Sequence, residues 1–363
     1  MKKKKLLFIQ HCLRGGGAER VLMKILDNLD FNRYEVDLLL LYNEGVYLSK
    51  VHPRINIRSV YPHYRGHSSL FSHLLPFRLF FELKYKKKKY DYEIAFLEGL
   101  TTKILWNSLN RSSKKIAWIH SDLLRQKGRL SSKELKAYQK TDKIICVSED
   151  VKRALVQMAP ELESKSQVIY NPIDTEEIRS SVSPSDVKHP NPTIIAVGSL
   201  YKVKGYDILI EAHRKLLEKG IMHQVHIYGE GPMQEELENR IIEAGVSETF
   251  LLKGFAPNPY TAIAHADLFV SSSRVEGFSL VIAEALILGK PVVSTRTSGP
   301  VELLENGKYG MLVEPENPDA LADAIGDLLT HPDKKEHFEK MANERASFFD
   351  MKKALDEVYA LFS

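Results

Sequence analysis

Short apolar runs recur along the whole chain, and longer stretches with apolar residues at helical spacing lie between them. Runs of this length predict buried strands, and the stretches between them predict helices. Strands are predicted at 4–10, 35–41, 92–96, 115–119, 143–147, 193–197, 224–228, 249–252, 268–270, 291–295 and 307–313. Because strands and helices alternate, the sequence favours an α/β fold built on parallel sheets.

A polar, proline-bearing stretch at 180–192 interrupts the alternation near the middle of the chain. It follows the segment Tyr-Asn-Pro-Ile-Asp at 170–174. A chain of 363 residues is long enough for two domains that each bury a core. We therefore predict a domain boundary between 172 and 190.

The clearest unit of the second half is the strand, helix and strand at 267–295. Its helix is predicted from Ser279 to Leu288, because Ser279 is a favourable N-cap residue. Gly289 stands where a helix ends in the left-handed conformation, and Pro291 prevents its continuation. The stretch is thus a βαβ unit with a well-marked helix start.

Two glutamates flank that helix start. Glu276 precedes it in the loop, and Glu284 lies inside it, where side chains lean toward the N-terminus. Free amides at a helix start favour a bound phosphate, and Gly277 permits a close approach to the backbone. This pattern suits a ligand whose hydroxyls flank a diphosphate, such as a sugar nucleotide. The spacing alone is equally compatible with an ordinary βαβ unit in which Glu276 is a loop charge and Glu284 faces solvent.

The segment Glu-Gly-Phe-Ser-Leu-Val-Ile-Ala-Glu, from Glu276 to Glu284, resembles the Glu-x7-Glu motif of family 4 retaining glycosyltransferases, or glycosyl transferases group 1. The resemblance implies the GT-B fold, in which two Rossmann-like domains have parallel sheets facing across a cleft. It implies an N-terminal acceptor domain at 1–172 and a C-terminal nucleotide-sugar donor domain at 173–346. It also implies that the last helix, at about 347–363, crosses back to the N-terminal domain.

Three other segments carry the resemblance. Gly-Gly-Ala-Glu-Arg-Val, which begins with Gly16 and Gly17, is similar to the family's N-terminal loop, whose glycine amides lie between donor and acceptor. His120, at the end of a predicted strand, stands at the position of the family's histidine beside the donor sugar. Asn-Pro-Ile-Asp at 171–174 matches the segment between the family's two domains. Asp122 has no comparable assignment.

The loop after the first strand of the second half departs from the family pattern. Lys204 and Gly205 match the family's Lys-Gly pair, whose lysine neutralises the donor diphosphate. Ser199 stands where the family has an arginine that shares this task. Lys202 is the nearest replacement, although an ammonium group cannot reproduce the bidentate contact of a guanidinium.

The resemblance implies a metal-independent, retaining sugar transfer without a cofactor. His120, Lys204 and Glu276 are the expected catalytic residues, with Glu276 on hydroxyls of the donor sugar and Glu284 on the ribose. The leaving phosphate is expected to accept the acceptor's proton on the same face of the sugar. A UDP-sugar is the first choice of donor. The remaining residues expected at the donor are Gly16, Gly17, Ser199, Lys202, Gly229, Gly254, Phe255, Gly277, Phe278, Ser279 and Leu280.

Charge is unevenly distributed. Residues 1–170 contain 32 Lys and Arg against 17 Asp and Glu, whereas the remainder contains 19 against 30. An apolar, aromatic stretch within 62–90 ends in a lysine cluster at 84–89, a pattern that favours docking on an anionic membrane surface over a core helix with a solvated end. With a basic N-terminal half, the expected acceptor is a glycan or a polyprenyl-diphosphate-linked glycan of cell-surface polysaccharide biosynthesis.

Cysteine content and hydropathy indicate the compartment. Cys12 and Cys146 lie in or beside predicted strands and provide no disulfide framework. No apolar run approaches the length of a spanning helix, and the N-terminal lysines lead into too short an apolar run for a signal peptide. We expect a cytoplasmic protein, peripheral on the inner face of the cell membrane.

Two other functional classes are also compatible with the sequence. A non-catalytic subunit that binds a sugar nucleotide is motivated by Ser199, and the GT-B fold also serves sugar-nucleotide epimerases. Nucleic-acid binding accounts for the basic half but not for the paired glutamates, so we expect no nucleic-acid partner.

Overall fold

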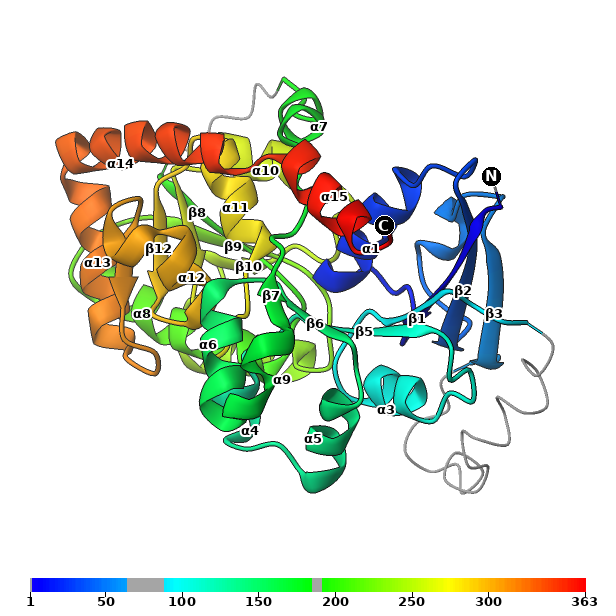
Figure 1. Ribbon diagram of the computed structural model, residues 1–363. Helices are drawn as coiled ribbons and strands as arrows, with labels where there is room; N and C mark the ends of the chain where they lie inside the picture. Colours follow the sequence, from blue (N-terminus) through cyan, green and yellow to red (C-terminus); the bar gives the residue numbers. More distant parts are fainter. Residues whose placement is uncertain (1, 64–87, 185–190) are drawn as a thin grey trace. The chain divides into compact units, whose positions relative to one another are not determined.

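The computed structural model describes residues 2–63, 88–184 and 191–363. The chain divides into two compact units (Figure 1). Unit 1 comprises Met1–Pro172 and Lys352–Ser363, and unit 2 comprises Ile173–Met351. The aromatic stretch predicted to dock on a membrane, from Phe71 to Leu83, and the lysines at 84–87 lie outside the described residues.

Unit 1 is built on a seven-stranded parallel sheet with the order β3-β2-β1-β4-β5-β6-β7. The predicted parallel arrangement is confirmed. Its strands are β1 (Lys4–Gln10), β2 (Tyr34–Tyr42), β3 (Asn56–Tyr61), β4 (Tyr92–Ala95), β5 (Lys114–Ile119), β6 (Lys143–Cys146) and β7 (Ser166–Val168). Its α-helices are α1 (Gly17–Asp27), α3 (Leu100–Trp106), α4 (Leu123–Lys127), α5 (Ser132–Gln139), α6 (Glu149–Met158) and α15 (Met351–Ala360).

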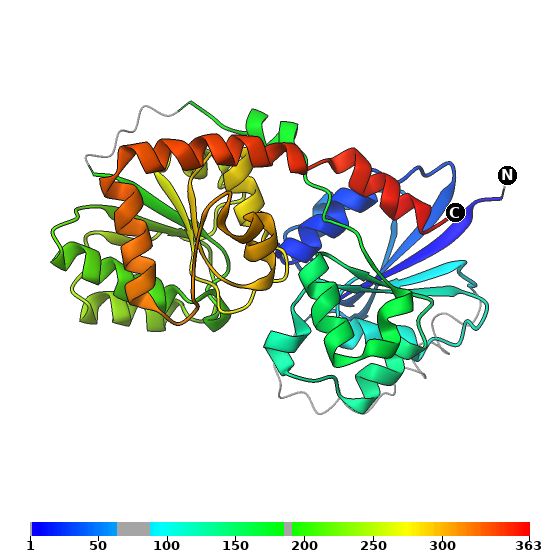
Figure 2. The same cartoon turned by 60° about the vertical axis from the view of Figure 1, so that its left-hand side comes forward.

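The C-terminal helix α15 packs within unit 1 beside α1 (Figures 1 and 2). The Tyr359 hydroxyl donates to the carbonyl of Asn28 at 2.6 Å. Phe362 is completely buried, and its ring centroid lies 6.2 Å from that of Phe8 and 5.5 Å from that of Tyr92. Burying a phenyl group contributes about 2–3 kcal/mol, so this aromatic cluster anchors the chain end to the sheet.

Unit 2 contains a six-stranded parallel sheet with the order β10-β9-β8-β11-β12-β13. Helices α8, α9 and α13 pack together on one side, and α10, α12 and α14 surround α11 on the other (Figure 2). Its strands are β8 (Thr193–Val197), β9 (Gln224–Tyr228), β10 (Phe250–Leu252), β11 (Leu268–Ser271), β12 (Val292–Thr295) and β13 (Met311–Val313). Its α-helices are α7 (Thr175–Ser180), α8 (Tyr206–Glu218), α9 (Gln234–Glu243), α10 (Tyr260–His265), α11 (Leu280–Ile287), α12 (Ser298–Leu303), α13 (Pro318–Thr330) and α14 (Pro332–Arg345).

Four elements differ from the sequence expectation. Strands β3 and β7 were not predicted, since both carry polar residues at sheet edges. The predicted strand at 307–313 is wrong at its start, because Glu305 and Asn306 take left-handed conformations in a tight turn and the strand begins at Met311. Helix α14 was also not predicted, because its sequence is almost entirely polar.

The core of unit 2 encloses a pair of histidines. His213 Nδ1 lies 2.7 Å from His223 Nε2, and His223 Nδ1 lies 2.8 Å from the carbonyl of Ile221. His213 Nε2 lies 2.8 Å from the hydroxyl of Thr249. Both side chains are fully buried, and burial together with the neighbouring His223 lowers the pKa of His213 to about 3. The pair is therefore neutral in the folded protein.

This pair makes stability depend on pH. The pKa of His213 is lower in the folded chain than in the unfolded chain, so unfolding takes up a proton below about pH 6.5. We expect the free energy of unfolding to fall by about 1.4 kcal/mol per pH unit from this proton alone as the pH drops from 6.5. In urea denaturation followed by circular dichroism, His213→Leu should flatten the pH dependence between 6.5 and 5. The exposed His337→Leu should leave that dependence unchanged, and equal slopes for wild type and His213→Leu would contradict the assignment.

Candidate functional site

The switch point of the unit 2 sheet lies between β8 and β11. From β8 the chain continues outward to β9 and β10, whereas from β11 it continues the other way to β12 and β13. Ligands of open parallel sheets bind at the carboxyl ends of the strands that flank such a point. The loops 198–205 and 272–279 leave β8 and β11 at this place.

Two of the expected catalytic residues meet across these loops. Lys204 Nζ lies 2.6 Å from Glu276 Oε2, and the hydroxyl of Ser273 lies 3.4 Å from the same oxygen. The Lys204 and Glu276 side chains keep 22% and 16% of their surface exposed. The ammonium group and the carboxylate are therefore paired but accessible, so a polar ligand can exchange with either partner.

Helix α12 packs against the backbone segment that precedes α11. The Gly299 amide donates to the Glu276 carbonyl at 3.0 Å. A Cβ on Gly299 would lie 2.5 Å from the Cα of Phe278, so only glycine permits this approach. Phe278 is itself buried. This packing fixes the loop containing Gly277 and Phe278 just before Leu280, where α11 begins.

The predicted capping role of Ser279 is wrong. Ser279 immediately precedes α11, but its backbone is left-handed, with φ 70°, and its side chain caps no amide. Its hydroxyl is buried and has no hydrogen-bond partner among the described residues. Because the hydroxyl does not cover the helix start, the first turn of α11 keeps the amides that a phosphate requires.

Glu284 lies in the second turn of α11 and is 3% exposed. The alternative in which Glu284 faces solvent is therefore wrong. A carboxylate buried to this degree requires hydrogen-bond donors or a cation around it, and side chains on a helix lean toward its N-terminus.

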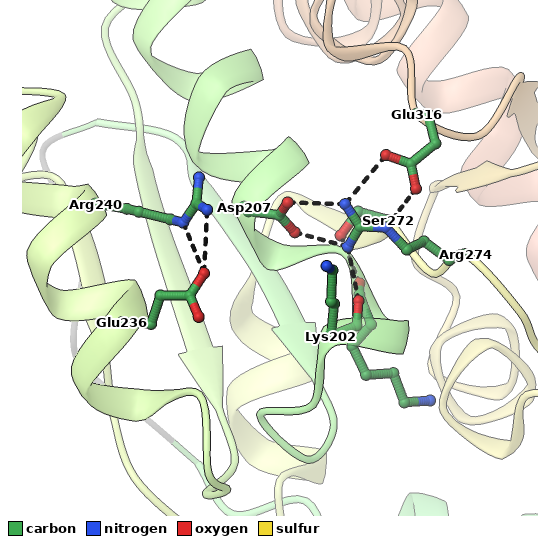
Figure 3. Close-up of polar contacts among 8 residues, drawn as sticks. Lys202, Asp207, Glu236, Arg240, Ser272, Arg274 and Glu316 are labelled. Carbon is green, nitrogen blue, oxygen red and sulfur yellow. Dashed lines mark hydrogen bonds and ion pairs between the residues drawn. The ribbon is translucent and has the colours of Figure 1, made fainter.

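Besides Lys204, the β8 loop contains one other cation, that of Lys202. Ser199 and Lys202 are both exposed, and the Lys202 carbonyl accepts a hydrogen bond at 2.6 Å from Nη1 of Arg274. Figure 3 shows Arg274 between Asp207 and Glu316. Sequence reasoning missed Arg274, since a charged residue beside a motif glutamate gives no sign of its tertiary partners.

The loops after β9 and β10 lie side by side at the same edge. The Gly229 amide donates to the Gly254 carbonyl at 2.8 Å, and a Cβ on Gly229 would lie 1.9 Å from the Gly198 carbonyl oxygen. Gly229 is therefore required by packing. Gly254 faces open space, and the neighbouring Phe255 is 47% exposed, which leaves an aromatic surface available for stacking.

In unit 1, His120 follows β5 at the carboxyl edge of the sheet. Its backbone amide donates to Glu98 Oε2 at 2.9 Å, and its ring centroid lies 5.0 Å from that of Phe96. Burial lowers the pKa of His120 to about 4, so the ring is neutral near pH 7. Its Nε2 is buried and has no hydrogen-bond partner among the described residues. Glu98 was not predicted as a site residue.

Two other polar groups of unit 1 have local structural partners. Asp122 caps α4 by accepting from the Arg125 amide at 2.9 Å. The Glu19 carboxylate accepts from the amides of Gly15 at 2.6 Å and Gly16 at 3.0 Å. A phosphate can use the Gly16 amide only after Glu19 withdraws, whereas Gly17 begins the helix.

Residues 2–63, 88–184 and 191–363 contain no group of three or more His, Cys, Asp or Glu side chains arranged to hold a metal ion. Within the same ranges, no helix has both the length and the apolar character needed to cross a membrane. Lys88, a described lysine of the predicted docking cluster at 84–89, pairs with Asp37 at 2.7 Å and with Glu35 at 2.9 Å.

Comparison with known proteins adds independent evidence. The family described as Glycosyltransferase Family 4 matches residues 15–177, and the family described as Glycosyl transferases group 1 matches residues 178–345. The chain is similar to the N-acetylgalactosamine-N,N'-diacetylbacillosaminyl-diphospho-undecaprenol 4-alpha-N-acetylgalactosaminyltransferase of Campylobacter jejuni. The two are 30% identical over 358 residues, which cover 94% of each chain.

Solved structures support the same fold. The structure of Anabaena Alr3699/HepE in complex with UDP-glucose matches with a TM-score of 0.81 and 22% identity, covering 99% of each chain. The sucrose-phosphate synthase of Thermosynechococcus elongatus matches with a TM-score of 0.83 and 17% identity, covering 99% of this chain and 98% of the other. The expected GT-B class, with two parallel-sheet Rossmann-like domains, is confirmed. The chain belongs to the group 1 glycosyltransferases with the GT-B fold.

Proposed function

We propose that this glycosyltransferase moves a sugar, with retention of configuration, from a nucleoside diphosphate sugar to a lipid-linked glycan. The observation that carries the proposal is the accessible pair of Lys204 and Glu276 at the switch point of unit 2. A cation and a carboxylate side by side match a ligand in which a diphosphate adjoins a hydroxylated ring.

We propose the roles of the site residues from the charge that develops in the reaction and from the family resemblance. Breaking the bond between the anomeric carbon and the diphosphate oxygen leaves positive charge on the sugar and adds a negative charge to the terminal phosphate of the diphosphate. Lys204, Lys202 and the first amides of α11 receive the negative charge. Glu276 binds sugar hydroxyls, and Glu284 binds the ribose. Positive charge on the protein neutralises the diphosphate, so the proposed transfer needs no metal.

The neutral His120 of unit 1 accepts a hydrogen bond from a hydroxyl of the transferred sugar. In the proposed front-face substitution, the acceptor oxygen bonds to the anomeric carbon as the diphosphate leaves. The acceptor's proton passes to the departing phosphate oxygen. Unit 1 holds the acceptor, and unit 2 holds the donor.

The nature of donor and acceptor is proposed from the similar proteins. The Anabaena protein was solved with UDP-glucose, which favours a UDP-sugar as donor. The Campylobacter enzyme's name describes transfer to a diphospho-undecaprenol-linked glycan, which favours a polyprenyl-linked acceptor and a role in building cell-surface glycans. The positive charge of residues 1–170 supports peripheral contact with an anionic membrane surface.

A thermal-shift screen tests the donor. At a concentration of about 100 times its Kd, a ligand that binds only the folded state adds about 2.7 kcal/mol, which raises the Tm of a unit of this size by about 5–10 °C. We expect UDP and UDP-sugars to produce this shift, and uridine without phosphates to produce none. If UDP-, GDP-, ADP- and TDP-sugars all leave Tm unchanged, the proposed donor class is wrong.

Transfer itself is measured with the best-binding donor and a polyprenyl-diphosphate-linked saccharide. A stable shift without any transfer to such acceptors would favour the alternative of a non-catalytic subunit, which the serine at position 199 motivates. Transfer with an inverted anomeric centre would contradict the retaining mechanism.

A further inference from the structure

Arg274 lies two residues before Glu276 in the loop between β11 and α11. Its guanidinium group contacts three partners (Figure 3). Nη1 donates to the Lys202 carbonyl at 2.6 Å, and Nη1 and Nη2 each donate to the Asp207 carboxylate at 2.8 Å. Nε and Nη2 donate to the Glu316 carboxylate, the latter at 3.1 Å.

These contacts use every donor that Arg274 has. A guanidinium group carries five N–H bonds, one on Nε and two on each Nη atom. The five hydrogen bonds to Lys202, Asp207 and Glu316 account for all of them. Arg274 therefore has no N–H group left for a diphosphate, and it does not replace the arginine that is missing at Ser199.

The same segment holds the turn that carries Lys204. Three consecutive carbonyls of the turn Lys202–Lys204 accept hydrogen bonds from residues 272–274. The Arg274 side chain donates to the first, the Arg274 amide to the Val203 carbonyl at 2.7 Å, and the Ser272 hydroxyl to the Lys204 carbonyl at 3.0 Å. The backbone at Gly205 is equally close, because a Cβ there would lie 2.1 Å from the Ser272 carbonyl oxygen.

The charges of Asp207 and Glu316 make Arg274 hard to replace by another side chain. Hydrogen bonds to Asp207 raise the pKa of Arg274. Burial opposes ionisation of Asp207, but its hydrogen bonds with Arg274 nonetheless lower its pKa, so both groups stay ionised. Glu316 contributes from a left-handed backbone conformation, with φ 59°. Lysine has the charge but not the planar fork that these two carboxylates engage.

We propose that Arg274 is a positioning residue that ties the Lys202–Lys204 turn to the segment bearing Glu276, so that the Lys204 ammonium group and the Glu276 carboxylate meet the donor as one unit. The proposal rests on the proposed function, because it assigns both groups to the donor. It explains how the site works with Ser199 in place of an arginine: the guanidinium group stabilises the loop, and the lysines contact the ligand.

The kinetic test compares Arg274→Ala and Arg274→Lys with Arg240→Ala. Arg240 forms an exposed pair with Glu236, at 3.0 Å, in the same unit (Figure 3), and its loss should leave transfer unchanged. Because a displacement of about 1 Å can cost about 100-fold in rate, we expect kcat/KM for the donor to fall by about 100-fold in Arg274→Ala. Arg274→Lys should lose nearly as much, since the fork is absent. Loss in neither Arg274 variant would overturn the proposal.

A double-mutant cycle separates positioning from a general loss of stability. If Arg274 acts through Lys204, then Lys204→Ala combined with Arg274→Ala should be about as slow as Lys204→Ala alone. A combined loss equal to the product of the two single losses would show that Arg274 acts independently, and the proposal would fail. If Arg274→Ala does not fold, Arg274→Lys takes its place in the cycle, because it retains the charge between the two carboxylates.

Trypsin cleavage supplies a readout that needs no ligand. Cleavage after Lys202 and Lys204, mapped by mass spectrometry well below the Tm, should be faster in the Arg274 variants than in wild type or Arg240→Ala. Rates equal to those of the wild type would overturn the positioning role. The wild-type chain could fail both to bind a sugar nucleotide and to transfer its sugar. That result would count against the proposed function alone, and cleavage of the turn would still decide whether Arg274 orders it.

Discussion

Replacing Lys204 by alanine is expected to lower kcat for sugar transfer by about 10²–10³-fold, which is the loss typical of removing one group that stabilises developing negative charge. The ammonium group lies 2.6 Å from Glu276 at the switch point of the unit 2 sheet. Ser199 supplies no charge beside it. Lys204 is therefore the principal cation in our proposal for the leaving diphosphate, and single-turnover transfer to a saturating acceptor measures its contribution.

A matched control and a second variant interpret this loss. Lys219 pairs with Asp323 at 2.7 Å on the exposed surface of the same unit, so Lys219→Ala should retain full turnover. Lys204→Ala also removes the cation beside the Glu276 carboxylate, and the unpaired carboxylate then repels the diphosphate. Adding Glu276→Gln should restore part of the UDP affinity but not turnover. Wild-type turnover in Lys204→Ala would contradict the site assignment.

Replacing Glu284 by alanine is expected to weaken UDP binding by about 10–100-fold, the equivalent of about 1.5–3 kcal/mol for hydrogen bonds to a charged group. Glu284 is 3% exposed and lies in α11, whose N-terminus faces the proposed binding site of the diphosphate. Since removal of a buried side chain can also destabilise the fold, Glu284→Gln should accompany it, as it keeps the shape and removes only the charge. Calorimetric titration with UDP measures both.

Ribose analogues identify the group that Glu284 binds. Wild type should bind UDP more tightly than 2'-deoxy-UDP or 3'-deoxy-UDP, whereas Glu284→Ala should no longer discriminate against at least one of them. This cycle removes the carboxylate and the hydroxyl separately and together, so it isolates their interaction. Discrimination that survives unchanged in Glu284→Ala would assign the ribose to other residues.

The order of strands and helices could be predicted from the sequence because it depends on neighbouring residues. Apolar runs mark β1, β9 and β12 close to their observed bounds, and Gly289 ends α11 in the left-handed conformation, with φ 70°. Elements whose burial pattern is weak were missed. Helix α14 has few apolar residues, and β3 and β7 carry polar residues at sheet edges, so local periodicity could not reveal them.

The family resemblance placed Glu276 and Lys204 among the expected site residues, but it could not establish their contact. The two are 72 positions apart in sequence, and they meet because β8 and β11 are neighbours in the sheet. Only tertiary structure decided that Arg274 uses all its donors on Lys202, Asp207 and Glu316. It also decided that Glu19 takes the Gly16 amide.

The sequence by itself determined the family, the α/β class and the chemical types of the expected site residues, since these follow from local pattern and motif. Tertiary structure decided which of those groups pair with one another and which support the backbone. The physical reason is that hydrogen bonds and ion pairs between loops depend on strand order and close packing. Those relations join residues far apart in the chain, where periodicity carries no information.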